Sequence, residues 1–197
     1  MRFFSPARHA LLALLLFYPG GAPGAEVVDQ LGRHMTVPSQ PRRVVALAPS
    51  ITEIVFALDR GERLVGVTRY SDFPPAARAL PKVGSYIHLD LEQIVALAPD
   101  LCLAVKDGNP KAVVERLEAF GIPVYAVDPR DLDTVARTIN EIGGLLNAAP
   151  AADRLVADLR RRIQAVRDRV AAKSQRPKVF FQIGISPIVS VGSPTII

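Results

Sequence analysis

The sequence predicts an α/β fold: a lobe built on a mostly parallel sheet, one long helix, and the start of a second α/β unit. From residue 44 to residue 146, short apolar runs alternate with helical patterns. This β, α, β, α order with short connections is typical of parallel strands joined by right-handed crossovers. The helical pattern that follows, residues 150–173, would be roughly 36 Å long, which is too long for another crossover.

Local patterns place the first elements of the lobe. After a linker-like stretch with two prolines, the apolar run 44–48 is an expected strand that Pro49 ends. Ser50 and Glu53 have the spacing of a capping box, in which each side chain satisfies the other residue's backbone N–H. We therefore expect a helix over residues 51–58.

The next elements are a strand, a loop and a short helix. Residues 64–67 form the second expected strand, and two consecutive prolines keep the loop 70–75 extended. Asp90 and Gln93 repeat the capping spacing in front of an expected helix over residues 91–98.

The alternation then continues to the end of the lobe. Residues 101–105 form a continuous apolar run, as expected of a parallel strand covered on both faces. A helix that ends at Gly121 follows, then a strand over 123–127 and a helix from Asp133 to about Leu146. The apolar stripe of the first of these helices is Val113, Val114, Leu117 and Phe120.

A new strand is expected after the long helix, over residues 179–183, and a loop follows it to Ile197. A strand and a loop cannot bury a core by themselves. The C-terminal part is therefore expected to be the opening of a second, truncated domain.

Composition and charge narrow the function. The chain has 197 residues, of which 49% are hydrophobic and 22% charged, as in an ordinary globular protein. The net charge of +5 is concentrated in residues 150–173, where basic residues alternate with aspartates and no aromatic residue accompanies them. This pattern is typical of a solvated helix face, so we expect no nucleic-acid partner. The one cysteine, Cys102, excludes an internal disulfide and is expected to be buried.

Residues 1–25 have the three regions of a secretory signal peptide. A short basic start precedes an uninterrupted apolar run, residues 10–18, and the small residues Ala22, Gly24 and Ala25 follow. The apolar run is too short to cross a hydrocarbon core of ~30 Å as a helix. We therefore expect a secreted, cleaved chain, with a retained membrane anchor as the alternative.

The loops after the strands are the candidate ligand site, because open parallel sheets bind ligands beyond the carboxyl ends of their strands. These loops are 49–50, 68–73 and 106–109. Tyr70, Phe73 and Tyr86 place aromatic rings on or near this edge. An apolar wall with few hydroxyls suits a large, mainly uncharged organic ligand. The alternative is that these rings only pack against the neighbouring prolines.

Enzymatic signatures are largely missing from the sequence. It contains no Gly-Lys-Ser or Gly-Lys-Thr phosphate loop, no Gly-x-Ser-x-Gly elbow and no His-Glu-x-x-His. His88 precedes an expected helix and has two open interpretations: an exposed loop residue, or a ligand contact that includes an axial bond to a metal centre. One histidine and one cysteine fourteen residues apart indicate no metal site of the protein's own.

Four segments carry a family resemblance. They are residues 41–53 (PRRVVALAPSITE), 65–75 (VGVTRYSDFPP), 91–101 (LEQIVALAPDL) and 180–187 (FFQIGISP). In order and spacing they resemble the periplasmic cobalamin-binding proteins of ATP-driven (ABC) importers, part of a wider family that also binds haem and iron siderophores. The resemblance implies two Rossmann-like lobes joined by one rigid helix, with the ligand in the cleft between them.

The resemblance also implies a domain plan and a location. Its four parts are a signal peptide (1–25), an N-terminal ligand-binding lobe (26–148), an interlobe helix (149–175) and the start of a truncated C-terminal lobe (176–197). The chain would work in the periplasm and touch the membrane only through the permease. Cobalamin would be its cargo, so no resident cofactor and no metal site are expected.

Site residues carry over by position. Tyr70 and Tyr86 would line the N-lobe wall of the cobalamin pocket, with Ser50 beside them. Glu92 corresponds to the acidic residue that docks against arginines of the permease. Its alternative role is local, because a carboxylate at a helix N-terminus is favourable to the helix dipole by about 0.3–1 kcal/mol.

Three departures keep the cargo open. Tyr86 and Val105 stand where the best-known cobalamin binders have tryptophan, His88 replaces a small residue, and most of the second lobe is missing. A less aromatic wall with a nearby imidazole leaves another corrinoid, haem or an iron siderophore as alternative cargo. One wall alone buries less ligand surface and implies weaker binding.

The leading hypothesis is therefore a periplasmic cobalamin carrier that is not an enzyme. Two alternatives of other classes remain: a tetrapyrrole metal chelatase that would use His88 with Asp90, and a truncated product without function.

Overall fold

The computed structural model describes residues 24–171, 173–175 and 177–190 of the chain. The expected signal peptide, residues 1–25, lies outside these residues except for its last two. None of the helices in the described ranges is long and apolar enough to cross a membrane.

A four-stranded parallel sheet forms the centre of the molecule. Its strands are β3 (Val44–Ala46), β4 (Leu64–Val67), β5 (Leu101–Val105) and β6 (Val124–Val127), in the spatial order β4-β3-β5-β6. Every neighbouring pair is parallel. The predicted α/β fold with a parallel sheet is confirmed, and β5 spans the predicted residues from first to last.

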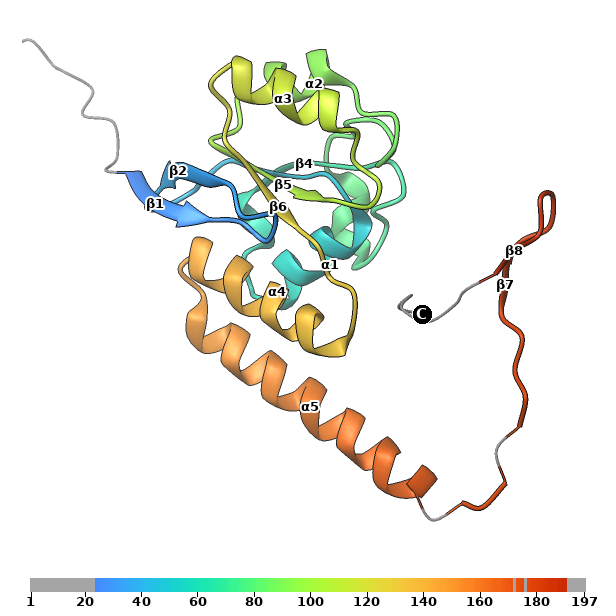
Figure 1. The fold of residues 1–197 in the computed structure, drawn as a ribbon. Helices are drawn as coiled ribbons and strands as arrows, with labels where there is room; N and C mark the ends of the chain where they lie inside the picture. Colours follow the sequence, from blue (N-terminus) through green and yellow to red (C-terminus); the bar gives the residue numbers. More distant parts are fainter. Residues whose placement is uncertain (1–23, 172, 176, 191–197) are drawn as a thin grey trace, which may run out of the picture.

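Helices cover both faces of this sheet (Figure 1). They are α1 (Pro49–Ala57) and α4 (Leu132–Leu145) on one face, and α2 (Leu91–Ala96) and α3 (Lys111–Ala119) on the other. Two short 3-10 helices lie in loops, η1 (Gly61–Arg63) and η2 (Pro75–Ala79). Successive residues of β5 point to opposite faces: Leu103 joins the apolar cluster with α1 and α4, and Cys102 joins the cluster with α2 and α3.

Cys102 is fully buried, as predicted. Burial raises the pKa of its thiol to about 12, and the nearby carboxylate of Asp100 acts in the same direction. The thiol is therefore neutral at pH 7 and packs as a small apolar side chain.

A β-hairpin lies where the sequence indicated a linker. It consists of β1 (Gly24–Val28) and the antiparallel β2 (His34–Pro38), so His34 is a strand residue and the linker prediction was wrong there. The connecting turn closes around the buried Asp29, whose Oδ1 accepts hydrogen bonds from the backbone N–H groups of Leu31 and Arg33 (2.9 Å each). The Arg33 guanidinium then donates to the carbonyl of Val124 (2.8 Å), which fixes the hairpin to β6.

The two predicted capping boxes have different outcomes. Helix α1 begins at Pro49, Ala48 is its N-cap, and no side chain caps it, so the predicted Ser50–Glu53 box was wrong. Proline suits the first helical position because its φ is already helical and its missing N–H would have no partner there. The second prediction is confirmed in its N-cap, since Asp90 Oδ1 accepts from the Gln93 N–H (3.0 Å) and α2 follows. The helix ends at Ala96, two residues earlier than expected.

Phe120 is a further correction. Val114 and Leu117 of the predicted stripe are buried, but Phe120 is 60% exposed because it follows the last residue of α3, where the chain turns at Gly121 (φ 76°). An aromatic residue at a helix end need not continue the buried face of that helix.

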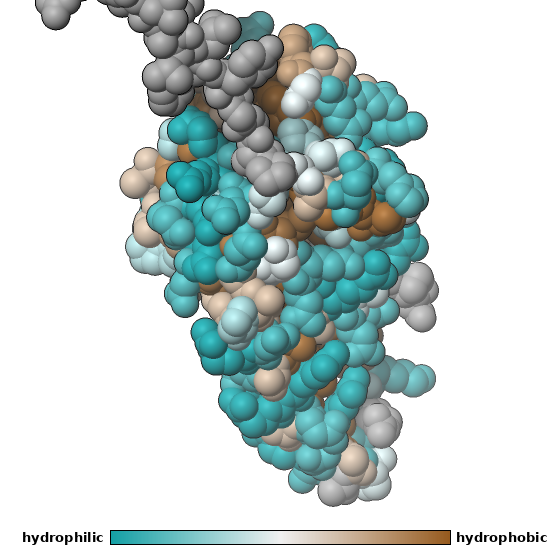
Figure 2. Space-filling model, turned by 90° about the vertical axis from the view of Figure 1, so that its left-hand side faces the viewer, coloured by the Kyte–Doolittle hydropathy of each residue, from teal (hydrophilic) through white to brown (hydrophobic). Residues whose placement is uncertain are grey.

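The long helix is α5 (Ala149–Ala171), close to the predicted range. Its first turns pack on α4, where Gly143 allows a close approach because a methyl group there would overlap the Ala152 side chain. Its far half leaves Val166 and Val170 about half exposed. Figure 2 shows a mainly hydrophilic surface over this lower part of the molecule, as expected for its arginines.

The C-terminal strand prediction was displaced. A two-stranded hairpin of β7 (Gln182–Gly184) and β8 (Val189–Ser190) replaces the strand expected over 179–183, and it stands apart from the sheet (Figure 1). Apolar side chains in it, such as Ile183 and Ile185, are exposed. The division of the chain into two lobes and an interlobe helix stays a prediction.

Candidate functional site

Three of the predicted site residues line one hollow. Tyr70, Tyr86 and His88 meet around a space of about 250 Å³, which Arg69, Ser85 and Ile87 complete. Two loops form it: the one that follows β4, and the turn over residues 84–89. The hollow therefore lies beyond the carboxyl end of β4, where a parallel sheet is expected to bind ligands.

The two aromatic rings of this hollow face solvent in part. Tyr70 is 61% exposed and Tyr86 is 39% exposed. His88 is also exposed, and its backbone N–H donates to Ser85 Oγ (3.0 Å), so His88 follows directly after the tip of a tight turn, which is formed by Tyr86 and Ile87. Exposed rings whose backbone is fixed are well suited to cover an apolar ligand, because little conformational entropy is lost when the ligand binds.

Ser50 and Glu92 lie outside this hollow. Ser50 is exposed in the first turn of α1, at the carboxyl end of β3, and does not line it. Glu92 is exposed in the first turn of α2, directly after the Asp90 cap. The roles of all five predicted site residues stay predictions.

Three buried hydroxyls hold the Tyr70 loop in place. Thr52 Oγ1 in α1 donates to Ser71 Oγ (3.0 Å), which lies 2.9 Å from Thr68 Oγ1. Lys82 Nζ donates to the carbonyls of Ser71 (3.0 Å) and Ala77 (2.9 Å). Burial of its ammonium lowers the pKa of Lys82, partly offset by Asp72. No local pattern in the sequence indicated a role for these supporting residues.

Asn109 was also missed, although its loop was named. Its side chain is 7% exposed, and it bonds to Leu47, Val105 and Tyr86, which belong to three separate segments. The signal in the sequence was an Asn after a Gly directly beyond a buried strand, where short polar side chains often satisfy backbone groups.

A charged group lies at the carboxyl ends of β5 and β6. Asp128 pairs with Lys106 and with Arg130 at 2.9 Å each, and its side chain is 13% exposed. The hydrogen bond from Arg130, together with that from Lys106, holds the pKa of Asp128 below its usual value although burial acts in the opposite direction. The ion pair between Asp128 and Lys106 connects the loop after β6 to the loop after β5.

The Asp128 pairing should appear as a pH-dependent stability. Asp128→Asn is expected to lower the free energy of unfolding at pH 7 by about 0.5–1 kcal/mol, because the cationic partners are largely solvated. A depressed folded-state pKa stabilises the protein above the unfolded value of about 3.9, and this contribution is lost as the pH falls through the folded value. Urea unfolding from pH 7 downward should show the difference from wild type shrinking.

The matched control is Asp59→Asn, an exposed aspartate at φ 55°, a conformation that asparagine also adopts. It should have little effect at any pH. A deficit in Asp128→Asn that stays constant with pH would show that the ion pairs do not carry it.

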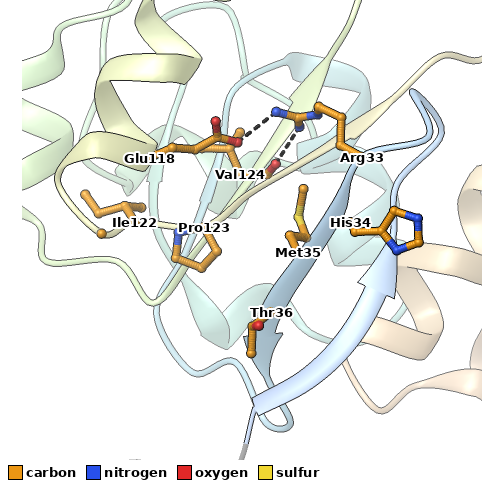
Figure 3. A pocket seen from close by; sticks show the side chains of 9 residues that line it. Arg33, His34, Met35, Thr36, Glu118, Ile122, Pro123 and Val124 are labelled. Atoms are coloured by element: carbon orange, nitrogen blue, oxygen red, sulfur yellow. Dashed lines mark hydrogen bonds and ion pairs between the residues drawn. The ribbon is translucent and has the colours of Figure 1, made fainter.

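Another groove lies at the opposite end of β6 (Figure 3). It has a volume of about 360 Å³ between β2 and the residues that precede β6. Arg33 reaches across it to Glu118 (2.7 Å) and to the Val124 carbonyl. This groove lies at the amino end of the strand, so it does not have the position of a ligand site in a parallel sheet.

Across the described residues, no group of three or more His, Cys, Asp or Glu side chains is placed to hold a metal ion.

Comparison with known proteins gives one family and related carriers. The model of the family described as "Periplasmic binding protein" matches residues 44–193. The vitamin B12-binding protein of Yersinia pestis (strain Pestoides F) is 35% identical over 163 residues, which are 82% of this chain and 58% of the relative. The chain thus spans less than two thirds of the length of this curated relative.

Solved structures of such carriers share the fold. The periplasmic vitamin B12-binding protein of Vibrio cholerae has a TM-score of 0.71 and 32% identity, over 78% of this chain and 60% of that one. A periplasmic heme-binding protein from Pseudomonas aeruginosa has a TM-score of 0.69 and 31% identity, over 73% of this chain and 53% of that one. The heme-binding protein RhuT from Roseiflexus sp. RS-1 has a TM-score of 0.72 and 30% identity, over 78% of this chain and 60% of that one.

Proposed function

Because the chain belongs to the periplasmic binding protein family, we propose that it captures cobalamin or a related corrinoid in the periplasm and presents it to an ABC importer. In this proposal the ligand is cargo, and the chain catalyses no reaction on it. Two similar proteins, from Yersinia pestis and Vibrio cholerae, are described as vitamin B12-binding proteins. The 35% identity of the Yersinia pestis protein exceeds the 30–31% of the two heme-binding neighbours above.

The observation that carries the proposal is the convergence of Tyr70, Tyr86 and His88 on one hollow at the carboxyl edge of the sheet. Exposed aromatic rings offer apolar area to a large ligand, and ring contacts contribute about 0.5–1.5 kcal/mol beyond the area they bury. The space of about 250 Å³ is smaller than the roughly 300–1,000 Å³ of pockets that enclose a ligand. A corrinoid would therefore lie across the hollow with one face covered by this lobe.

Titration with cyanocobalamin tests the proposal. The mature chain should give saturable heat in calorimetry with a one-to-one end point, and a change in the visible spectrum of the corrinoid. A vitamin B12-binding relative serves as positive control under the same conditions. Binding by the relative, with neither heat nor a spectral change for this chain, would refute the proposal.

Haem is the second candidate cargo, favoured by the side chains of the hollow. A histidine nitrogen and a phenolic oxygen are groups that coordinate haem iron. The hollow is lined by one histidine, His88, and two tyrosines, Tyr70 and Tyr86. Titration with haemin distinguishes the two cargoes, because bound haem has a strong Soret band that a corrinoid lacks. A shifted Soret band that depends on His88 or a tyrosine, together with no response to cyanocobalamin, would assign haem.

Glu92 is proposed as the contact with the permease. Glu92→Gln should weaken association with a reconstituted cobalamin importer by about tenfold or more, since losing a charged contact commonly costs about 1.4 kcal/mol or more. Cyanocobalamin affinity should not change, because Glu92 lies outside the hollow. The measurement is co-sedimentation with importer-containing liposomes.

Glu115→Gln on α3 is the matched control, since Glu115 is another exposed helix carboxylate. It should leave association unchanged. A variant Glu92→Gln that melts at a lower temperature but associates normally would assign Glu92 to the helix dipole alone.

A further inference from the structure

We infer that Asn109 is a positioning residue that, together with Gly108, fixes the Tyr86 ring in the wall of the hollow. The inference concerns the site of the proposed function and rests on that function for the identity of the ligand. Its geometric content, the placement of one ring by one amide, is independent of the ligand.

The Asn109 amide joins three segments that are distant in the sequence. Its Nδ2 donates to the carbonyl of Leu47 (2.8 Å), directly after β3, and to the carbonyl of Tyr86 (2.7 Å). Its Oδ1 accepts from the Val105 N–H (2.7 Å), at the end of β5. Both amide hydrogens and the amide oxygen are therefore used, in a buried position where each lost bond leaves an unsatisfied backbone group.

The turn that carries Tyr86 depends on this bond. Ser85 and His88 bond to each other, with Ser85 N–H donating to the His88 carbonyl (2.9 Å) and His88 N–H donating to Ser85 Oγ. In the described part of the chain, the bond from Asn109 to Tyr86 is the hydrogen bond that connects residues 85–88 to the strands. Without it, the turn would be hydrogen-bonded to the rest of the lobe only through its two ends.

Gly108 contacts the ring of Tyr86. Its φ of 144° is a conformation that side-chain-bearing residues rarely adopt, and a methyl group on its Cα would overlap the Tyr86 ring. The Tyr86 ring therefore lies against the bare backbone of Gly108. The backbone carbonyl of Tyr86 accepts a hydrogen bond from the side-chain amide of Asn109, the residue that follows Gly108. Two adjacent residues thus fix both the backbone and the ring of Tyr86.

Asn109→Asp tests the amide with almost no change in volume. The carboxylate supplies no N–H, and one of its oxygens would face the carbonyls of Leu47 and Tyr86, so both bonds are lost. Gly108→Ala adds a methyl group against the ring and strains the loop backbone at φ 144°, so it tests the Gly108 position as a whole while the Asn109 side chain is retained. Asn140→Asp, at an exposed position on α4, is the matched chemical control.

The first measurement needs no ligand. In protein with ¹³C-labelled tyrosine rings, wild type and Asn140→Asp should show nuclear Overhauser contacts between the Gly108 Hα atoms and one tyrosine ring, assigned with Tyr86→Phe. Asn109→Asp should lose these contacts and Gly108→Ala should shift the ring resonances, while signals of the buried Tyr125 persist. Retention of the Gly108 contacts in a folded Asn109→Asp protein would overturn the inference.

The second measurement uses cyanocobalamin. Asn109→Asp and Gly108→Ala should each weaken binding by about tenfold or more, which corresponds to about 1.4 kcal/mol. In a Tyr86→Ala background the same changes should have little further effect, because the ring they position is gone. An equal loss with and without Tyr86 would mark a general structural role instead. If wild type does not bind cyanocobalamin, the proposed function fails, and the ring contacts alone decide the inference.

Discussion

Leu103→Ala is expected to lower the free energy of unfolding by about 2–5 kcal/mol, the range for truncating a buried leucine. Leu103 is fully buried in β5, between Ala46 of β3 and Tyr125 of β6, and it points toward α1 and α4. Strands and helices pack around it on every side, so the cavity left by the change cannot readily collapse. Such a loss is a large part of the roughly 5–15 kcal/mol that holds a domain folded.

Urea unfolding followed by circular dichroism at 222 nm measures this effect. Leu132→Ala is the control, because Leu132 is 45% exposed at the start of α4 and its truncation should change stability by about 0.5 kcal/mol or less. If both variants unfolded at the same urea concentration, the sheet would not be the stabilising centre of the chain.

Removing the aromatic wall should have the largest effect on binding. Tyr70→Ala and Tyr86→Ala are each expected to weaken cyanocobalamin binding by about tenfold or more, because each deletes a ring that the ligand would cover, worth roughly 1–2 kcal/mol. Tyr→Phe changes at the same positions keep the ring and should retain most of the affinity. Calorimetric titration of the four variants gives the comparison.

Phe120→Ala is the matched control for this experiment. Phe120 is 60% exposed, much like Tyr70, but it stands at the end of α3, near the amino end of β6. Its loss should leave affinity unchanged. Equal losses in Phe120→Ala and Tyr86→Ala would mean that the ligand does not lie on the proposed wall.

The sequence was most informative where a few adjacent residues are decisive. The apolar run of β5 and the Asp90 cap of α2 formed as predicted, since each depends on residues within a few positions. The Ser50–Glu53 box had the right spacing but was displaced, because Pro49 set the start of α1 two residues earlier than predicted. Spacing alone does not reveal which of two adjacent start signals the backbone follows.

The candidate site was predictable in part, because its position follows from the strand pattern. Loops after parallel strands converge at one edge, so Tyr70, Tyr86 and His88 could be named from the strand pattern and the family resemblance, and the structure places them around one hollow. The residues that support these three were not predictable. Asn109 bonds to carbonyls 62 and 23 residues away, and neither distance leaves a trace in the local pattern.

The order of strands and helices, the parallel sheet and the edge at which a ligand would bind were determined by the sequence alone, because periodicity, caps and turn residues act over one or two turns of chain. The tertiary structure alone decided the hairpin β1–β2 and the support of the Tyr86 turn. Both depend on polar groups that find partners far away in the chain, such as Arg33 with the Val124 carbonyl and Asn109 with that of Leu47. Such partners become neighbours only when the sheet has formed. A buried backbone group without a hydrogen-bond partner costs about 1–3 kcal/mol, so the folded structure must supply that partner.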